Sequence, residues 1–527
     1  MDILSFKPGH DGTVALISNS NLIFSLEAEK DSFPRYSDSH PNLFLDSLSR
    51  VDRIPDVVAI SGWRKKSYNQ VFKPLEAGYI DIDPNKIISR KNLVFGKQVN
   101  FFSSSHVRSH ILGAYGMSPF EQGERCYCLV WEGVVGSFYE IDENINITHL
   151  GEILEAPGTK YSFIYHLADP TVKSTVGHLR PEVAGKLMAL TSFSDRSSYT
   201  VEEKKLVEFI LAQKYTKPPE FINKNALSQY SFYNIGVESK EFKNFAGKFS
   251  DTIFDSFYNF AKENLKKRIP LLISGGCGLN CDWNTKWKDS NLFKEVFVPP
   301  VANDSGSAIG TAIDAQLYYT GKAKIEWSVY DGEHFINDEI SLEEIDIYDL
   351  DYQDIAIFLS QNKIIGWVQG KYEIGPRALG NRSILASPLD SKMQSKLNKI
   401  KLRENFRPVA PICIEEDVSK YFDWKGSSPY MLYFQRLKTD KLPAITHVDG
   451  TARVQTVNYN QNKEMYKLLT EFRNITGFSV LCNTSLNFNG MGFINRRSDL
   501  LEYCKSQGLD GFVIHDKFYK FGDQCRK

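Results

Sequence analysis

Two segments far apart in the chain have the same strand–turn–strand pattern, and this repetition limits the folds that the sequence can adopt. Short apolar runs separated by tight polar turns predict three strands within residues 3–26. Residues 126–141, CYCLVWEGVVGSFYEI, repeat the arrangement with a turn at Glu132-Gly133. No motif repeats at a fixed period, but two such hairpins favour a duplicated half-domain.

The segments that follow predict strands alternating with helices. Residues 195–270 are polar with apolar positions at helical spacing, which indicates a helical insertion. Buried-type strands are expected at 271–274 and 296–298, and the Gly- and Ala-rich residues 305–316 predict a closely packed helix. This alternation is typical of an α/β fold.

The length of 527 residues favours two domains, one of them large. An acidic segment without a strong period, residues 331–351, separates two Gly-rich blocks. We therefore expect three parts. They are a first domain over residues 1–335, a linker over 336–350, and a smaller α+β domain over 351–527.

Charge and cysteine usage restrict the partners and the compartment. The 63 Lys and Arg residues are balanced by 64 Asp and Glu residues, so nothing attracts the whole chain to nucleic acid or an anionic membrane. No run of 18 apolar residues occurs, and the start carries charges where a signal peptide needs an apolar run. The eight scattered Cys residues form no CxxC pair. We expect a cytoplasmic protein without nucleic-acid or membrane partners, with a homodimer as the commonest oligomeric state.

Two histidines and two acidic residues form a candidate metal site. In a helix that starts after Ser105, His106 and His110 lie four residues apart on one face and can bind one ion. Glu132 lies at the second hairpin turn and Asp304 at the end of a strand, positions that converge on the ligand crevice of an α/β sheet. Such ligands suit Fe(II), Mn(II) or Zn(II). The alternative is a pair of unrelated histidines.

Two glycine clusters, residues 274–280 and 303–307, each follow a predicted strand and precede a helix-like run. Their backbone N–H groups can approach phosphates, but neither cluster is a Walker loop or a Rossmann fingerprint. Tight structural turns explain them equally well.

Basic residues in Gly- and Pro-bounded turns are concentrated after residue 370. Together with Asn, Thr and Ser donors they favour a pocket for a compact polyanion such as a phosphate ester over scattered surface charges. The stretches concerned are GPRALGNRS at 375–383, KIKLRENFRP at 399–408, HVDGTAR at 447–453 and NTSLN at 483–487.

In these motifs the chain resembles the ATP-dependent O-carbamoyltransferases of antibiotic and nodulation-factor biosynthesis. The resemblance spans nearly the whole chain, and the opening FKPGHDG looks most like the branch that carbamoylates a hydroxymethyl-cephem. Further motifs that carry it are GGCGLN at 275–280, NDSGSAIG at 303–310, NFRPVAP at 405–411 and THVDGTARVQTV at 446–457.

The resemblance implies a large domain of the actin/Hsp70-like ATPase class, similar to the tRNA threonylcarbamoyl transferase. It also implies a smaller domain like threonylcarbamoyl-adenylate synthase. The small domain would make carbamoyl adenylate from carbamoyl phosphate and ATP, with Mg²⁺. The large domain would then pass the carbamoyl group to a hydroxyl of a small-molecule acceptor.

By motif position the resemblance also implies site residues. An iron-type ion, Fe(II) or another divalent transition metal, would be bound by His106, His110 and Asp304. Glu132 would join them, although the family usually has Asp-Gly where this chain has Glu132-Gly133. His10, beside Asp11, would act as a base near the acceptor. Nucleotide contacts in the transfer domain would come from Lys30, Gly275, Gly276 and Asn280. The adenylate-forming site would be lined by Arg377, Arg382, Lys401, Arg407, Arg453, Asn483 and Ser485.

Two other functions stay open on the sequence alone. One is a tRNA-modifying (threonyl)carbamoyl transferase, against which the absence of a basic stripe with interleaved aromatic residues counts. The other is a metabolite-binding relative that has lost its chemistry, against which the joint presence of His10, the two metal-type histidines and the C-terminal arginines counts.

Overall fold

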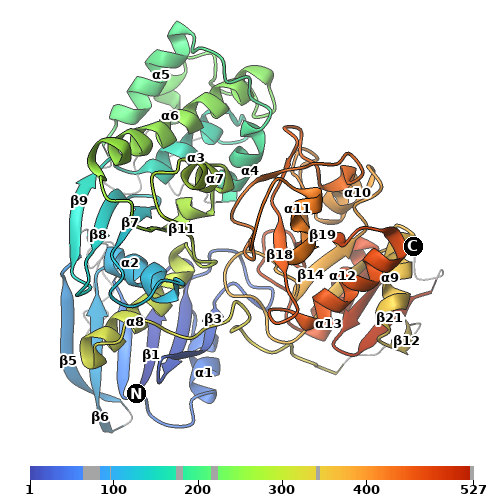
Figure 1. The fold of residues 1–527 in the computed structure, drawn as a ribbon, viewed down its shortest axis with the longest axis horizontal. Helices are drawn as coiled ribbons and strands as arrows, with labels where there is room; N and C mark the ends of the chain where they lie inside the picture. Colours follow the sequence, from blue (N-terminus) through green and yellow to red (C-terminus); the bar gives the residue numbers. More distant parts are fainter. Residues whose placement is uncertain (63–83, 95, 174–181, 215–222, 340–344, 523–527) are drawn as a thin grey trace. The chain divides into compact units, whose positions relative to one another are not determined.

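The computed structural model describes residues 1–62, 84–94, 96–173, 182–214, 223–339 and 345–522 (Figure 1). The predicted linker over 336–350 thus lies partly outside the described residues. The chain forms two compact units, one combining Met1–Met117 with Pro299–Lys527 and the other spanning Ser118–Val298. The border predicted between residues 335 and 351 falls within the first unit, between its two large sheets, and the domain limits stay a prediction.

The N-terminal part of the first unit is a six-stranded sheet in the order β3-β2-β1-β4-β6-β5. The first three strands form an antiparallel meander, while β4 pairs in parallel with β1, and β6 with β4. Helix α8 (Ser307–Thr320) packs on this sheet, and α2 (His106–Met117) packs on α8. The other elements are β1 (Asp2–Lys7), β2 (Thr13–Ser18), β3 (Asn21–Glu27), α1 (Pro41–Ser49), β4 (Val57–Ser61), β5 (Ile87–Val94) and β6 (Lys97–Ser104).

The second unit repeats this scheme. Its sheet has the order β11-β10-β7-β8-β9, with an antiparallel meander β7–β9 and parallel pairs of β10 with β7 and with β11. The predicted duplication and the α/β fold class are therefore confirmed. The strands are β7 (Cys126–Trp131), β8 (Gly136–Ile141), β9 (Ile147–Glu152), β10 (Leu271–Ser274) and β11 (Val296–Phe297). The helices are α3 (Pro157–Ala168), α4 (Glu182–Thr191), α5 (Val201–Ala212), α6 (Lys240–Asn264) and α7 (Cys281–Asp289).

The C-terminal part of the first unit is an eight-stranded sheet in the order β12-β21-β20-β13-β14-β19-β15-β18. Its strands are β12 (Ile345–Asp349), β13 (Ile364–Val368), β14 (Arg382–Ala386), β15 (Ala410–Ile414), β18 (Gln455–Val457), β19 (Val480–Ser485), β20 (Gly511–Ile514) and β21 (Lys517–Phe521). The other elements are α9 (Tyr352–Ser360), α10 (Met393–Ile400), α11 (Val418–Tyr421), β16 (Gln435–Arg436), β17 (Thr451–Ala452), α12 (Lys463–Thr476) and α13 (Arg497–Gln507).

Helices cover both faces of this sheet. In β13, Ile365 and Trp367 face α9 and α12, which lie side by side in Figure 1. Ile364 and Val368 belong to the core on the opposite face, which α10 and α13 cover. Because successive strand residues point to opposite faces, a strand buried on both sides must be apolar throughout, as IIGWV is.

Glycine permits the close packing of α2 against α8. A Cβ on Gly310 would overlap the carbonyl oxygen of Ser109 and lie 3.0 Å from the nitrogen of Gly113. The two helices thus meet backbone to backbone. This contact sets the position of α2, which carries His106 and His110.

We expect Gly310→Ala to lower the midpoint of thermal unfolding, because overpacking of this kind costs about 1–3 kcal/mol. The control is Gly185→Ala on α4, where an added Cβ would meet no heavy atom within 4 Å. Alanine favours an exposed helix by about 1 kcal/mol over glycine, so this variant should be unchanged or more stable. Equal midpoints for the two variants would contradict the packing argument.

No helix among the described residues is long and apolar enough to cross a membrane. The seven cysteines in the described part of the chain are all free thiols, and six of them are buried.

Candidate functional site

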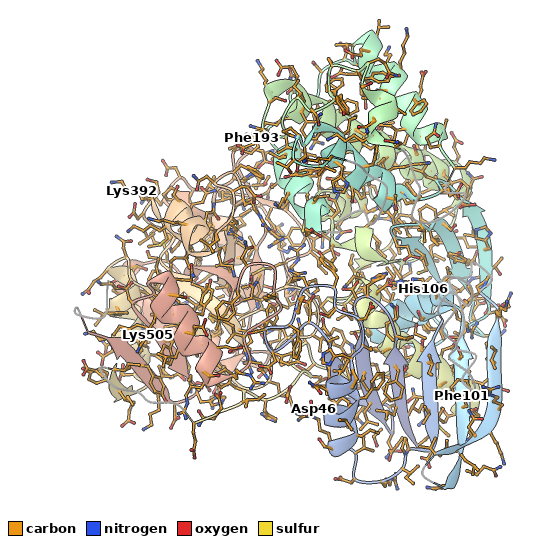
Figure 2. All side chains as sticks on the ribbon, turned by 180° about the vertical axis from the view of Figure 1, so that it is seen from behind. Asp46, Phe101, His106, Phe193, Lys392 and Lys505 are labelled. Atoms are coloured by element: carbon orange, nitrogen blue, oxygen red, sulfur yellow. The ribbon has the colours of Figure 1, made fainter. Side chains whose placement is uncertain are left out.

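His106 opens helix α2 directly after strand β6 (Figure 2). The hydroxyl of Ser105 accepts a hydrogen bond from the N–H of Arg108 (3.1 Å), as an N-terminal capping residue does. The helical register places His110 one turn later on the same face, and its Nε2 lies 3.2 Å from Nε2 of His106. Both imidazoles are buried.

Asp304 brings a carboxylate to these two histidines. It opens the short 3-10 turn Asp304–Gly306 that precedes α8. Its Oδ1 lies 3.2 Å from Nε2 of His110 and 3.5 Å from Nε2 of His106. Burial alone would raise the pKa of Asp304, but the charges of His106, Lys7 and His10 hold it well below its usual value. The group is therefore an ionised, buried carboxylate.

Two imidazole nitrogens and one carboxylate oxygen, all within 4.8 Å of one another, fit a divalent transition metal. Glu132, the fourth predicted ligand, is buried and follows β7 in the second unit. Its role as a ligand stays a prediction.

His10 lies at the turn between β1 and β2, and its side chain is 54% exposed. Its Nδ1 is 3.1 Å from Oδ2 of Asp11, and its Nε2 is 3.6 Å from Oδ2 of Asp304. Partial burial lowers the pKa of His10, but the Asp304 and Asp11 carboxylates outweigh it and raise the pKa above its ordinary value. A carboxylate-oriented, accessible imidazole suits a proton acceptor.

The C-terminal basic residues gather at one end of the eight-stranded sheet. Arg382 begins β14, Ser485 ends β19, Arg407 precedes β15 and Arg453 precedes β18, and these four strands are consecutive neighbours. Asn483 in β19 is paired with both β14 and β15, and its amide nitrogen donates to the side chain of Gln455 (2.9 Å). The sheet order thus converts distant motifs into one cluster.

Buried cations at this cluster repel one another. Burial, reinforced by Arg403, Arg407 and Arg35, holds the pKa of Lys401 well below its usual value. Burial and the neighbouring Arg407 lower the pKa of Arg403 to about 9. The Nη2 atom of Arg403 is buried and has no hydrogen-bond partner among the described residues. Such a cluster favours a bound anion, which would relieve the repulsion.

Two of the predicted binding residues, Arg382 and Lys401, direct their charged groups to oxygen atoms of the protein itself. The guanidinium of Arg382 is fully buried and donates to the carbonyls of Gln369, Gly370 and Asn381 and to Oδ1 of Asn495. The ammonium of Lys401 donates to the carbonyls of Ser485 and Asn487 and to Oδ1 of Asn487, at 2.7–2.8 Å. Both side chains therefore hold loops at this end of the sheet.

Glu373, which was not among the predicted site residues, holds a turn at this cluster. One oxygen of its fully buried carboxylate accepts from the N–H groups of Leu379 (2.7 Å), Asn381 (2.7 Å) and Arg382 (3.1 Å). This holds the turn that carries Arg377. The only sequence feature that pointed to Glu373 is its place two residues before the Gly375-Pro376 turn.

The four predicted nucleotide contacts of the transfer domain lie in different surroundings. The ammonium of Lys30 donates to the carbonyl of Gly375 (2.6 Å), in the turn that carries Arg377. Gly275 and Gly276 follow β10, and a Cβ on Gly276 would meet no heavy atom within 4 Å. The side chain of Asn280 accepts from the N–H of Trp283 (3.3 Å) and so caps α7.

Comparison with known proteins identifies the family. The family model "Carbamoyltransferase N-terminus" matches residues 65–313, and "Carbamoyltransferase C-terminus" matches residues 356–520. The 3'-hydroxymethylcephem-O-carbamoyltransferase of Amycolatopsis lactamdurans is 45% identical over 522 residues, covering 99% of each chain. Nodulation protein U of Rhizobium tropici is 32% identical, covering 94% of this chain and 92% of that protein.

Among solved structures, the activator of the 2-hydroxyisocaproyl-CoA dehydratase from Clostridium difficile with bound ADPNP is 11% identical. It matches with a TM-score of 0.33 over 61% of this chain and 98% of that one. The family models and the full-length relatives agree with each other, and this chain belongs to the carbamoyltransferase family.

Proposed function

We propose that this chain uses carbamoyl phosphate and ATP to make carbamoyl adenylate, and then transfers the carbamoyl group to a hydroxyl of a small-molecule acceptor. The observation that carries the proposal is a pair of chemically different clusters. Buried and half-buried cations gather at one end of the eight-stranded sheet, and a histidine–carboxylate cluster with an accessible imidazole lies at β1 and α2. The first suits phosphates, and the second suits an alcohol that must lose a proton.

The cation cluster is where we place adenylate formation. Carbamoyl phosphate and ATP bring several negative charges together, which Arg377, Arg403, Arg407 and Arg453 would bind. Water attacks the phosphorus of carbamoyl phosphate, the P–O bond to the carbamoyl oxygen breaks, and inorganic phosphate and carbamate form. A carbamate oxygen then attacks the α-phosphorus of ATP, the bond to the β-phosphate breaks, and pyrophosphate leaves. The role of the arginines is to hold both anions in line and to stabilise the charge that develops on the phosphoryl oxygens.

The histidine–carboxylate cluster is where we place transfer. His10, oriented by Asp11, accepts the proton of the acceptor hydroxyl as its oxygen attacks the carbamoyl carbon, and AMP leaves. A divalent ion bound by His106, His110 and Asp304 would supply a Lewis acid for the carbonyl or phosphoryl oxygen. Fe(II) is the ion that we propose, and Glu132 is the further ligand.

For the acceptor we propose an antibiotic-type alcohol of the hydroxymethyl-cephem class. The support is the relative of A. lactamdurans, which is named for 3'-hydroxymethylcephem and aligns with 99% of this chain at 45% identity. The nodulation protein U relatives, at about 31–32% identity, are more distant.

The test is to incubate the purified chain with carbamoyl phosphate, ATP, Mg²⁺ and a hydroxymethyl-cephem, and to follow pyrophosphate and product mass. We expect pyrophosphate release and an acceptor that gains one carbamoyl group, both dependent on ATP. Product formed without ATP would contradict the adenylate route. If protein that has been loaded with Fe(II) releases pyrophosphate without forming any product, the acceptor is a different compound, which a screen of other hydroxylated compounds would then identify.

Removal of metal should abolish product formation and spare pyrophosphate release. The reason is that the metal-type residues are distinct from the cation cluster. Chelation followed by gel filtration, with metal content measured by atomic emission, gives the apo protein, and Fe(II) added back should restore transfer. Full transfer in a verified metal-free preparation would refute the metal site.

A further inference from the structure

Lys7, which lies in the FKPGHDG motif, is a buried cation at the histidine–carboxylate cluster, and neither the resemblance nor the proposed reaction gives it a role. It is the last residue of β1 and is fully buried. Its Nζ lies 3.3 Å from Oδ2 of Asp304. It also donates to the carbonyls of Pro8 (3.1 Å) and His10 (2.9 Å). An ammonium has three protons, and these three acceptors match them.

The two oxygens of Asp304 therefore face different partners. Oδ1 lies 3.2–3.5 Å from the Nε2 atoms of His110 and His106. Oδ2 faces Nζ of Lys7 at 3.3 Å and Nε2 of His10 at 3.6 Å. A carboxylate can bind an ion through one oxygen or through both, and a cation held against one oxygen leaves only the other available.

From this geometry we infer that Lys7 is a positioning residue that restricts Asp304 to binding the metal ion through Oδ1 alone. The inference rests on the proposed metal site. Single-oxygen binding by Asp304 keeps one coordination position of the ion from being filled by Oδ2. In addition, because the same ammonium binds the carbonyl of His10, Lys7 fixes the turn that carries the proposed base relative to the carboxylate.

The backbone of Lys7 is held independently of its side chain. Lys7 pairs with Thr13 across the β1–β2 ladder, and its carbonyl accepts from the hydroxyl of Ser39 (2.7 Å). Replacement of the side chain by the uncharged Met, which has a similar length, therefore leaves the strand pairing in place. What it removes is the charge that holds Oδ2.

The experiment loads wild type and Lys7→Met with Co(II), measures the metal content, and records the visible absorption of the ion. We expect one bound ion in each protein. The band of Lys7→Met should be weaker and shifted, because binding through a second carboxylate oxygen raises the coordination number. Carbamoyl transfer should fall by about 10- to 100-fold, as for other residues that orient metal ligands. Pyrophosphate release should be unchanged.

The matched control is Lys224→Met. Lys224 is also fully buried, and its ammonium donates to the carbonyls of Asp169 (2.5 Å) and Val172 (2.8 Å) in the second unit. This variant loses a buried ammonium of the same kind, and its Co(II) spectrum should equal that of wild type. An unchanged spectrum and transfer rate in Lys7→Met would overturn the inference.

A second measurement needs no variant. In a crystal structure of the metal-loaded wild type, Asp304 should bind the ion through one oxygen, with Lys7 on the other. Asp304 bound through both oxygens would overturn the inference and leave the proposed function intact. A wild type that binds no divalent ion while it still makes product would instead overturn the metal site itself.

Discussion

His110→Ala should still release pyrophosphate from carbamoyl phosphate and ATP, but it should form no carbamoylated acceptor. The imidazole of His110 is buried and lies within 3.2 Å of both His106 and Asp304, so its loss removes one of the three metal-type ligands of the first unit. The cations proposed for adenylate formation are untouched. The adenylate would then hydrolyse slowly, which consumes ATP without product.

Metal content and the two product assays check this prediction. His110→Ala should retain less metal than wild type after dialysis. His149→Ala is the control, because His149 is exposed on β9 and its ring contacts only the tilted ring of Tyr139 among the ring pairs of the described residues, at 5.1 Å between centroids. It should behave as wild type in every assay. Normal carbamoylation by His110→Ala would exclude this histidine from the transfer site.

Arg407→Ala should behave in the opposite way and lose adenylate formation. Its guanidinium lies among the cations that lower the pKa of Lys401 and Arg403, where we place the phosphates. Truncation of one partner of a charged pair costs about 2–5 kcal/mol. The side chain is 34% exposed, which favours the lower end, so we expect pyrophosphate release to fall by about 30-fold.

The structure indicates that this variant will fold. The carbonyl of Arg407, which the substitution retains, accepts from the amides of Gln394 (3.2 Å) and Asn398 (2.9 Å). The control Arg436→Ala removes an exposed arginine from the separate two-stranded sheet of β16 and β17 and should leave pyrophosphate release unchanged. When preformed carbamoyl adenylate is supplied, Arg407→Ala should again carbamoylate the acceptor, whereas His110→Ala should not.

Together these two variants test whether the half-reactions occupy separate sites. If both lose pyrophosphate release to the same degree, the two-site assignment is wrong, and one composite site must replace it. The same result would also remove the reason to separate Lys7 from the adenylate-forming residues.

Much of the architecture could be predicted from the sequence because it depends on local patterns. The strands around residues 3–26 and 126–141 could be predicted because side chains alternate between the two faces of a strand every second residue. The shared face of His106 and His110 could be predicted because a helix turns once every 3.6 residues. The structure has the two meanders and the helix at these places. The motifs between residues 6 and 487 indicated the family before any fold was known.

These local patterns could not predict which residues that are distant in the sequence lie close together in the fold. Asp304 is 194 residues from His110, and only the packing of α8 on the first sheet and of α2 on α8 brings them together. The same holds for the four neighbouring strands that gather the C-terminal motifs, since their order in the sheet differs from their order in the chain.

The tertiary structure also decided what individual charges do. Arg382 and Lys401 look equivalent to the other basic residues of the cluster in sequence, yet their donors are taken up by carbonyl groups of the surrounding loops. Lys7 looks like a surface charge at the end of a strand, but it is fully buried against Asp304. The sequence determined which charged groups and which local elements this protein has. The fold alone decided which of those charges meet, because burial and hydrogen-bond geometry are set by chain segments hundreds of residues apart.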